Sequence, residues 1–196
     1  MPASDWIEFD SARQTVLLQL ARTSITHGLQ FQQPAPLPAP ADEVLQQPRA
    51  SFVTLYRETA LRGCIGSLWP RRSLLVDVNE NAFAAAFRDP RFTAVGAEEL
   101  HLLQIELTVL SAIQPLSAVT DEAALLAQLR PGIDGVIIEQ AGRRSTYLPK
   151  VWQHFADAEQ FLQSLRQKAG LPGQFDAAAH YSVYQAQSFA QPWLSS

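Results

Sequence analysis

Apolar positions repeat along this chain with two different periods. The helical period places apolar residues on one face of helices that we expect at residues 11–26, 73–88, 120–129 and 158–169. Alternation of apolar and polar residues predicts strands at residues 51–57, 61–68, 104–110, 134–140, 143–148 and 181–187. Strands occur singly and in hairpins between helices. This order favours an α+β fold with a mixed, largely antiparallel sheet, helices packed on its faces, and room for a small second lobe beside a cleft.

Local signals predict where several of these elements end. Ser11 with Gln14 forms a capping box, and the pair His27-Gly28 is expected to end the first helix. Residues 32–48 contain five prolines and are expected to form an extended connection over the surface. The pair Ala141-Gly142 predicts a hairpin. Because alanine fits a type I′ turn poorly, we expect a type II turn or a bulge there.

Length and composition narrow the class of protein. The 196 residues suit one domain spanning 1–196, with the proline-rich connection inside it. The net charge of -4 argues against a nucleic-acid binder. A single cysteine excludes an intrachain disulfide and a multi-cysteine zinc site, and it suits a reducing cytoplasm. No apolar run is long enough for a membrane span, and no metal-ligand spacing or nucleotide-binding motif occurs, so no metal site and no cofactor are predicted.

The only cysteine lies in the hexapeptide Leu61-Arg62-Gly63-Cys64-Ile65-Gly66. Glycines on both sides of a thiol indicate a tight bend or the close approach of another group. In an extended segment Arg62, Cys64 and Gly66 point to one side, where Arg62 favours a thiolate. One hypothesis makes Cys64 a nucleophile, with one of the four histidines as base and with three residues in contact with the substrate: Gly63, Ile65 and Gly66. The alternative is a small hydrophobe packed in the sheet.

Acidic side chains elsewhere form a second set of candidates. Asp89 and Arg91 follow a predicted helix, where they serve either as a clamp for an anionic or amide-bearing ligand or as a capping ion pair. Glu106 lies on the polar face of the strand at 104–110, and we expect Arg62 to pair with it. Asp134 is either a third acid of the same cleft or a structural turn residue.

The hexapeptide and the segments around it resemble the AMMECR family, whose bacterial and archaeal members are called AmmeMemoRadiSam system protein A. The other matching segments occur in the family's order, at residues 52–55, 85–92, 99–100, 105–110, 130–135, 147–152 and 161–171. The resemblance as a whole spans roughly residues 10 to 190. The departures, Ser67-Leu68-Trp69 and the proline-rich insertion, lie outside the hexapeptide.

The resemblance implies a compact α+β fold with a large and a small lobe around a cleft. It also implies work with a Memo-like protein and a radical S-adenosylmethionine (radical SAM) enzyme, in a modification or oxidation pathway that the resemblance does not identify. Three hypotheses follow. The first is a thiol-dependent enzyme that uses Cys64, Arg62 and Glu106. The second is a non-catalytic binding or adaptor module for a peptide or metabolite. The third, a nucleic-acid-associated regulator, is disfavoured by the acidic charge.

Overall fold

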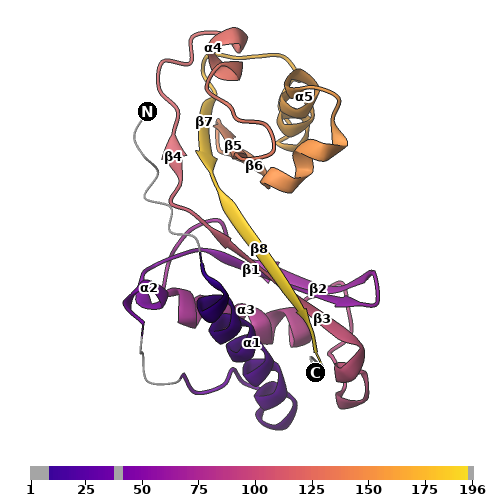
Figure 1. The fold of residues 1–196 in the computed structure, drawn as a ribbon. Helices are drawn as coiled ribbons and strands as arrows, with labels where there is room; N and C mark the ends of the chain where they lie inside the picture. Colours follow the sequence, from indigo (N-terminus) through magenta and orange to yellow (C-terminus); the bar gives the residue numbers. More distant parts are fainter. Residues whose placement is uncertain (1–8, 38–41, 194–196) are drawn as a thin grey trace. The chain divides into compact units, whose positions relative to one another are not determined.

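The computed structural model describes residues 9–37 and 42–193, which form two compact units (Figure 1). The first unit contains the chain up to residue 110 and from residue 187 on, and the second runs from 111 to 186. Each unit has its own four-stranded sheet and its own hydrophobic core. The α+β class is therefore confirmed, but the strands are divided between two sheets where the pattern suggested one.

The first unit packs helices on one face of a sheet with strand order β2-β1-β3-β8. Its elements are α1 (Ser11–Phe31), α2 (Glu43–Gln46), β1 (Ser51–Arg57), β2 (Ala60–Gly66), α3 (Leu74–Phe87), η1 (Ala97–Leu102), β3 (Leu103–Leu110) and β8 (Ala186–Pro192). β1 pairs antiparallel with both β2 and β3. Alternate residues of β1 and β3, among them Val53, Leu55 and Ile105, are fully buried in the core that α1 and α3 share.

Helix α1 is longer than the sequence pattern predicted. It begins at Ser11 as predicted, but the expected capping box of Ser11 and Gln14 is wrong: the cap is Asp10, whose carboxylate accepts a hydrogen bond from the Arg13 N–H at 2.9 Å. It continues through Gly28, where a Cβ would lie 2.4 Å from a ring carbon of Phe87 on α3. Gly28 therefore serves the close packing of two helices. The helix ends at Gln32, whose φ of 56° is left-handed.

The proline-rich connection contains one helical turn that its composition did not predict. α2 is capped by Asp42, which accepts a hydrogen bond from the Val44 N–H at 2.8 Å and another from Arg13 Nε at 2.8 Å. Residues 38–41 of the connection lie outside the described residues. Within the ranges that the structure describes, no helix is both long and apolar enough to cross a membrane.

The second unit has the strand order β4-β7-β5-β6, with antiparallel pairing. Its elements are β4 (Gln114–Pro115), α4 (Glu122–Leu126), β5 (Gly135–Gln140), β6 (Arg143–Tyr147), η2 (Pro149–His154), α5 (Ala158–Lys168) and β7 (His180–Tyr184). The predicted ends of α5 are confirmed. Asp157 accepts the Gln160 N–H at 2.8 Å, and Gly170 has a φ of +72°. Phe161 of α5 stacks on Trp152 with ring centroids 3.6 Å apart.

The β5–β6 hairpin turn corrects a prediction. Gln140 pairs with Arg143, so the loop has two residues. Ala141 has a φ of 49° and Gly142 a φ of 77°, and positive values at both positions define a type I′ turn. The twist of a type I′ turn matches that of paired strands, and this match outweighs the strain of a left-handed alanine.

Replacing that alanine is expected to stabilise the second unit. Ala141→Asn should raise the free energy of unfolding by about 0.5–1 kcal/mol, because asparagine tolerates the left-handed region better than alanine. Urea denaturation followed by circular dichroism measures the change. The matched control is Ala127→Asn, at an exposed position with right-handed backbone, which should bring no gain. An unchanged or lower urea midpoint for Ala141→Asn contradicts the explanation.

Candidate functional site

The cysteine-containing hexapeptide forms most of β2, whose pairing with β1 contains an irregularity. The register shifts by one residue between Leu55 and Tyr56, which leaves Arg62 as an extra residue on β2 in a β-bulge. Beyond the bulge, Cys64 lies opposite Thr54. Because Leu55 belongs to the buried core beneath α1 and α3, its neighbour Thr54 points to the other face of the sheet, and Cys64 points there with it.

Cys64, Thr54 and Glu106 form a row across three neighbouring strands. Thr54 pairs with Cys64 on one side and with Glu106 on the other, which makes their side chains neighbours on one face. The Thr54 hydroxyl donates a hydrogen bond to the Cys64 sulfur at 3.3 Å. With strands about 4.8 Å apart, the Cα atoms of Cys64 and Glu106 are separated by about 10 Å. The structure therefore brings two predicted catalytic residues to one face and adds Thr54, which sequence analysis missed.

Asp89 and Arg91 hold the backbone of Cys64 at the edge of the sheet. The Asp89 carboxylate accepts the Cys64 N–H at 2.8 Å, and Arg91 Nη2 donates to the Cys64 carbonyl at 3.1 Å. Arg91 also binds both oxygens of Asp89, at 2.9 Å and 2.7 Å. These two side chains occupy the positions that the N–H and C=O groups of another strand would take. Asp89 and Arg91 therefore form a capping ion pair. It satisfies the backbone N–H and C=O groups of Cys64 at the free edge of β2.

The ion pair shifts the pKa values of both Asp89 and Arg91. The Arg91 guanidinium and the Cys64 N–H hold the pKa of Asp89 well below its usual range, although burial acts in the opposite direction. Hydrogen bonding to Asp89 raises the pKa of Arg91. The Asp89 side chain is only 2% exposed, whereas that of Arg91 is 54% exposed. The carboxylate is therefore committed to the fold, and the guanidinium keeps a side that a ligand can reach.

Arg62 pairs with Glu99, which corrects the expected pairing with Glu106. Its Nε and Nη2 donate to the two Glu99 oxygens at 2.9 Å and 2.7 Å, and its Nη1 donates to the Thr93 carbonyl at 2.9 Å. The two charged side chains are 13% and 11% exposed. Arg62 in turn lowers the pKa of Glu99. The bulged residue Arg62 thus fastens β2 to the segment that precedes β3, and no spacing signal in the sequence predicts this pair.

Both glycines of the hexapeptide are explained by close contacts within the first unit. A Cβ on Gly63 would lie 2.2 Å from the backbone oxygen of Ala85 in α3. A Cβ on Gly66 would lie 2.4 Å from a ring carbon of Phe52. Ile65 packs against the core. The expected close approach at the glycines is confirmed, and the approaching groups belong to this chain. Substrate contact by these three residues stays a prediction.

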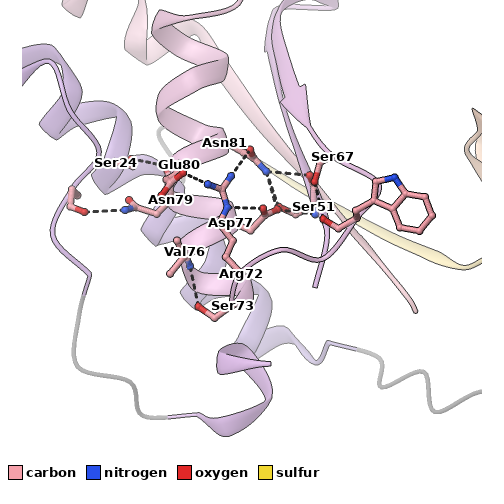
Figure 2. Close-up of polar contacts among 12 residues, drawn as sticks. Ser24, Ser51, Ser67, Arg72, Ser73, Val76, Asp77, Asn79, Glu80 and Asn81 are labelled. Carbon is pink, nitrogen blue, oxygen red and sulfur yellow. Dashed lines mark hydrogen bonds and ion pairs between the residues drawn. The ribbon is translucent and has the colours of Figure 1, made fainter. Parts of the chain in front are cut away.

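A buried polar network that sequence analysis missed fixes the start of β1 (Figure 2). Asp77 of α3 accepts hydrogen bonds from the Ser51 N–H at 2.9 Å, the Ser51 hydroxyl at 2.6 Å and the Asn81 amide at 2.8 Å. Arg72 Nε donates to its other oxygen at 2.9 Å. The Asp77 side chain is 2% exposed, so these partners replace water around the carboxylate. The network holds the strand that carries Thr54 against α3.

The remaining candidates are Asp134 and the histidines. Asp134 is in the second unit, where it accepts the Arg130 N–H at 2.8 Å and Arg130 Nη2 at 2.6 Å. Its place in a site with Cys64 stays a prediction. Among the residues that the structure describes, no histidine hydrogen-bonds the Cys64 sulfur, and no cluster of three or more His, Cys, Asp or Glu side chains suits a metal ion.

Comparison with known proteins identifies the family. The AMMECR1 family model matches residues 18–189. A protein of Methanothermobacter thermautotrophicus is 38% identical over 176 residues, covering 88% of this chain and 91% of that protein. The crystal structure of the uncharacterized protein PH0010 from Pyrococcus horikoshii has 30% sequence identity and a TM-score of 0.78, with 90% of each chain covered. The chain therefore belongs to the AMMECR1 family.

Proposed function

We propose that this protein carries a thiol-dependent site on the polar face of its first sheet, defined by Thr54, Cys64 and Glu106. One observation carries the proposal: Cys64 is held at three points, its N–H by Asp89, its carbonyl by Arg91 and its sulfur by Thr54. The residue is nevertheless only half-buried. A cysteine that merely fills a core needs no such positioning, whereas a reacting group gains from being fixed.

The neighbouring groups suit nucleophilic chemistry. A hydroxyl that donates to sulfur stabilises the thiolate, which is the reactive form of cysteine. The exposed part of Arg91 supplies a positive charge close to the sulfur and attracts a carbonyl or anionic substrate. Glu106 lies one strand beyond Thr54, where it is placed to exchange a proton with a substrate that spans the row. The reaction proposed is addition of the Cys64 thiolate to a carbonyl carbon: the S–C bond forms as the C=O π bond opens, and the carbonyl oxygen takes a proton from Glu106.

Alkylation of the folded protein by iodoacetamide tests this site. We expect Cys64 to be modified without denaturant, and we expect Thr54→Val to slow modification at pH 7 by about threefold or more, since the variant loses the donor that stabilises the thiolate. Mass spectrometry measures the rate. The matched control is Thr54→Ser, which keeps the hydroxyl and should react like the unmodified protein.

Two results would count against the thiol. One is modification of Cys64 only after urea is added, which means that the sulfur is closed off in the fold. The other is an equal rate for Thr54→Val and Thr54→Ser, which means that the hydroxyl has no influence on reactivity. Thermal unfolding of all three proteins, which should agree within a few degrees, shows whether a change in rate comes from a change in stability.

The second candidate is a non-catalytic binding or adaptor module. The observation that favours it is that Arg62 is committed to Glu99 and that both motif glycines have packing contacts, so much of the hexapeptide is explained by structure alone. On this alternative Arg91 provides the binding energy, and Cys64→Ala keeps partner binding while Arg91→Ala loses it. The partners proposed from the family resemblance are a Memo-like protein and a radical SAM enzyme. The lone free thiol suits a reducing cytoplasm as their common location.

A further inference from the structure

A hollow of about 480 Å³ with a largely apolar surface lies along α1. It is lined by side chains that share one face of the helix between Gln19 and Gln30, and by Trp193. This volume is in the range of small-molecule sites. Apolar residues of α1 are buried beneath the helix on the face of the sheet opposite to Cys64, so the hollow is separate from the thiol site proposed above.

Arg22 contributes a guanidinium to this hollow and is partly exposed. Its Nη2 donates to the Pro192 carbonyl at 2.6 Å, which orients the guanidinium. Its Nε is buried and has no partner within the described part of the chain. Because Nε is closed to solvent, a ligand oxygen meets the guanidinium at its exposed part and not at Nε.

The other lining groups leave the charge of Arg22 unneutralised. The described residues around the hollow include no carboxylate, and Arg22 forms no ion pair with them. Most of them are amides and hydroxyls, and His27 uses its Nδ1 toward the Gln33 carbonyl at 3.0 Å. A hollow with one guanidinium and neutral, largely apolar walls is complementary to a single negative charge on an apolar body.

The backbone of Trp193 is fixed, because its N–H donates to the Leu103 carbonyl at 2.7 Å. Its side chain packs partly against the core and lines the same hollow as Arg22. We propose that the hollow binds a small aromatic carboxylate, with the carboxylate on Arg22 and the ring against Trp193. The planar guanidinium matches the two oxygens of a carboxylate, and aromatic rings prefer to pack on one another.

Isothermal titration calorimetry of the full chain with benzoate tests the proposal. We expect saturable binding of benzoate, no binding of the neutral analogue benzamide, and at least a tenfold loss of affinity in Arg22→Gln. The matched control is Arg71→Gln, which removes an exposed arginine outside the hollow and should leave affinity unchanged. Arg22→Lys, which keeps the charge but loses the planar pair of donors, should bind benzoate more weakly than the unmodified protein.

A second variant distinguishes a loss of the binding site from misfolding of Arg22→Gln. Arg22→Gln also loses the bond to Pro192, so Trp193→Ala is titrated alongside it, and both should weaken benzoate binding while circular dichroism stays unchanged. Equal affinity of benzoate and benzamide, or full affinity in Arg22→Gln, would overturn the proposal. Equally tight binding of inorganic phosphate would also overturn it, since it would assign the site to any anion.

Discussion

Gly63→Ala is expected to destabilise the first unit by about 3 kcal/mol or more, at the upper end of what overpacking costs. The new Cβ would lie 2.2 Å from the backbone oxygen of Ala85. A backbone atom in a helix cannot rotate away as a side chain can, so either α3 or β2 must move. Urea denaturation followed by circular dichroism measures the loss, which we expect as a lower midpoint of unfolding.

The control for this substitution is Gly132→Ala. Gly132 has a φ of +77° with nothing within 4 Å of the added Cβ, so only backbone strain of about 1 kcal/mol is expected there. A double variant separates the two causes further: Ala85→Gly should not rescue Gly63→Ala, since the contact is with the backbone of residue 85. Equal losses at the two glycines, or rescue by Ala85→Gly, would show that the contact with α3 is not responsible.

Asp89→Asn is expected to cost about 2 kcal/mol at pH 7, the typical value of hydrogen bonds to a charged group. The amide keeps an acceptor for the Cys64 N–H but loses the charge that binds Arg91. The pKa of Asp89 is depressed in the folded protein, so its carboxylate contributes stability at every pH above the unfolded pKa of about 3.9. That contribution falls as pH drops below this value, because the unfolded carboxylate takes up a proton first, and it is lost once pH passes the depressed pKa of the native carboxylate.

The measurement is the free energy of unfolding of both proteins at pH 7, 5 and 3. The difference between them should be equal at pH 7 and 5 and clearly smaller at pH 3. Asp10→Asn serves as the control, because Asp10 is an exposed helix cap and asparagine caps helices as well as aspartate. A deficit for Asp89→Asn that is as large at pH 3 as at pH 7 would mean that the carboxylate charge is not its source.

Elements whose signals are local were predicted well. The cap at Ser73 and the apolar face behind it located α3, and the alternation around Glu106 located β3 with its buried and polar faces. The end of α1 and the hairpin turn were predicted wrongly. A glycine at position 28 indicates a helix end when only the sequence is known. In the structure it is required because the ring of Phe87 packs against it. The turn at Ala141 depends on the twist of the paired strands, which outweighs the preference of a single residue.

The sequence predicted which residues belong to the candidate site better than it predicted which of them pair with one another. Cys64, Asp89 and Arg91, all candidates from the sequence, do come together. Glu99 was missed as the partner of Arg62 because its contact depends on how residues 93–99 fold back toward β2. Such a contact between distant segments leaves no periodic trace in the sequence.

The hydrophobic pattern by itself determined that two strands meet in a hairpin ahead of an alanine-rich helix, with one cysteine on the second strand. It did not determine which face that cysteine takes. With unbroken pairing from the turn, Cys64 would lie opposite Val53 in the core, whereas the extra residue Arg62 moves it opposite Thr54. A shift of one residue reverses the faces of a strand. That shift is set by groups far along the chain, Ala85 against Gly63 and Glu99 on Arg62, so only the tertiary structure decided it.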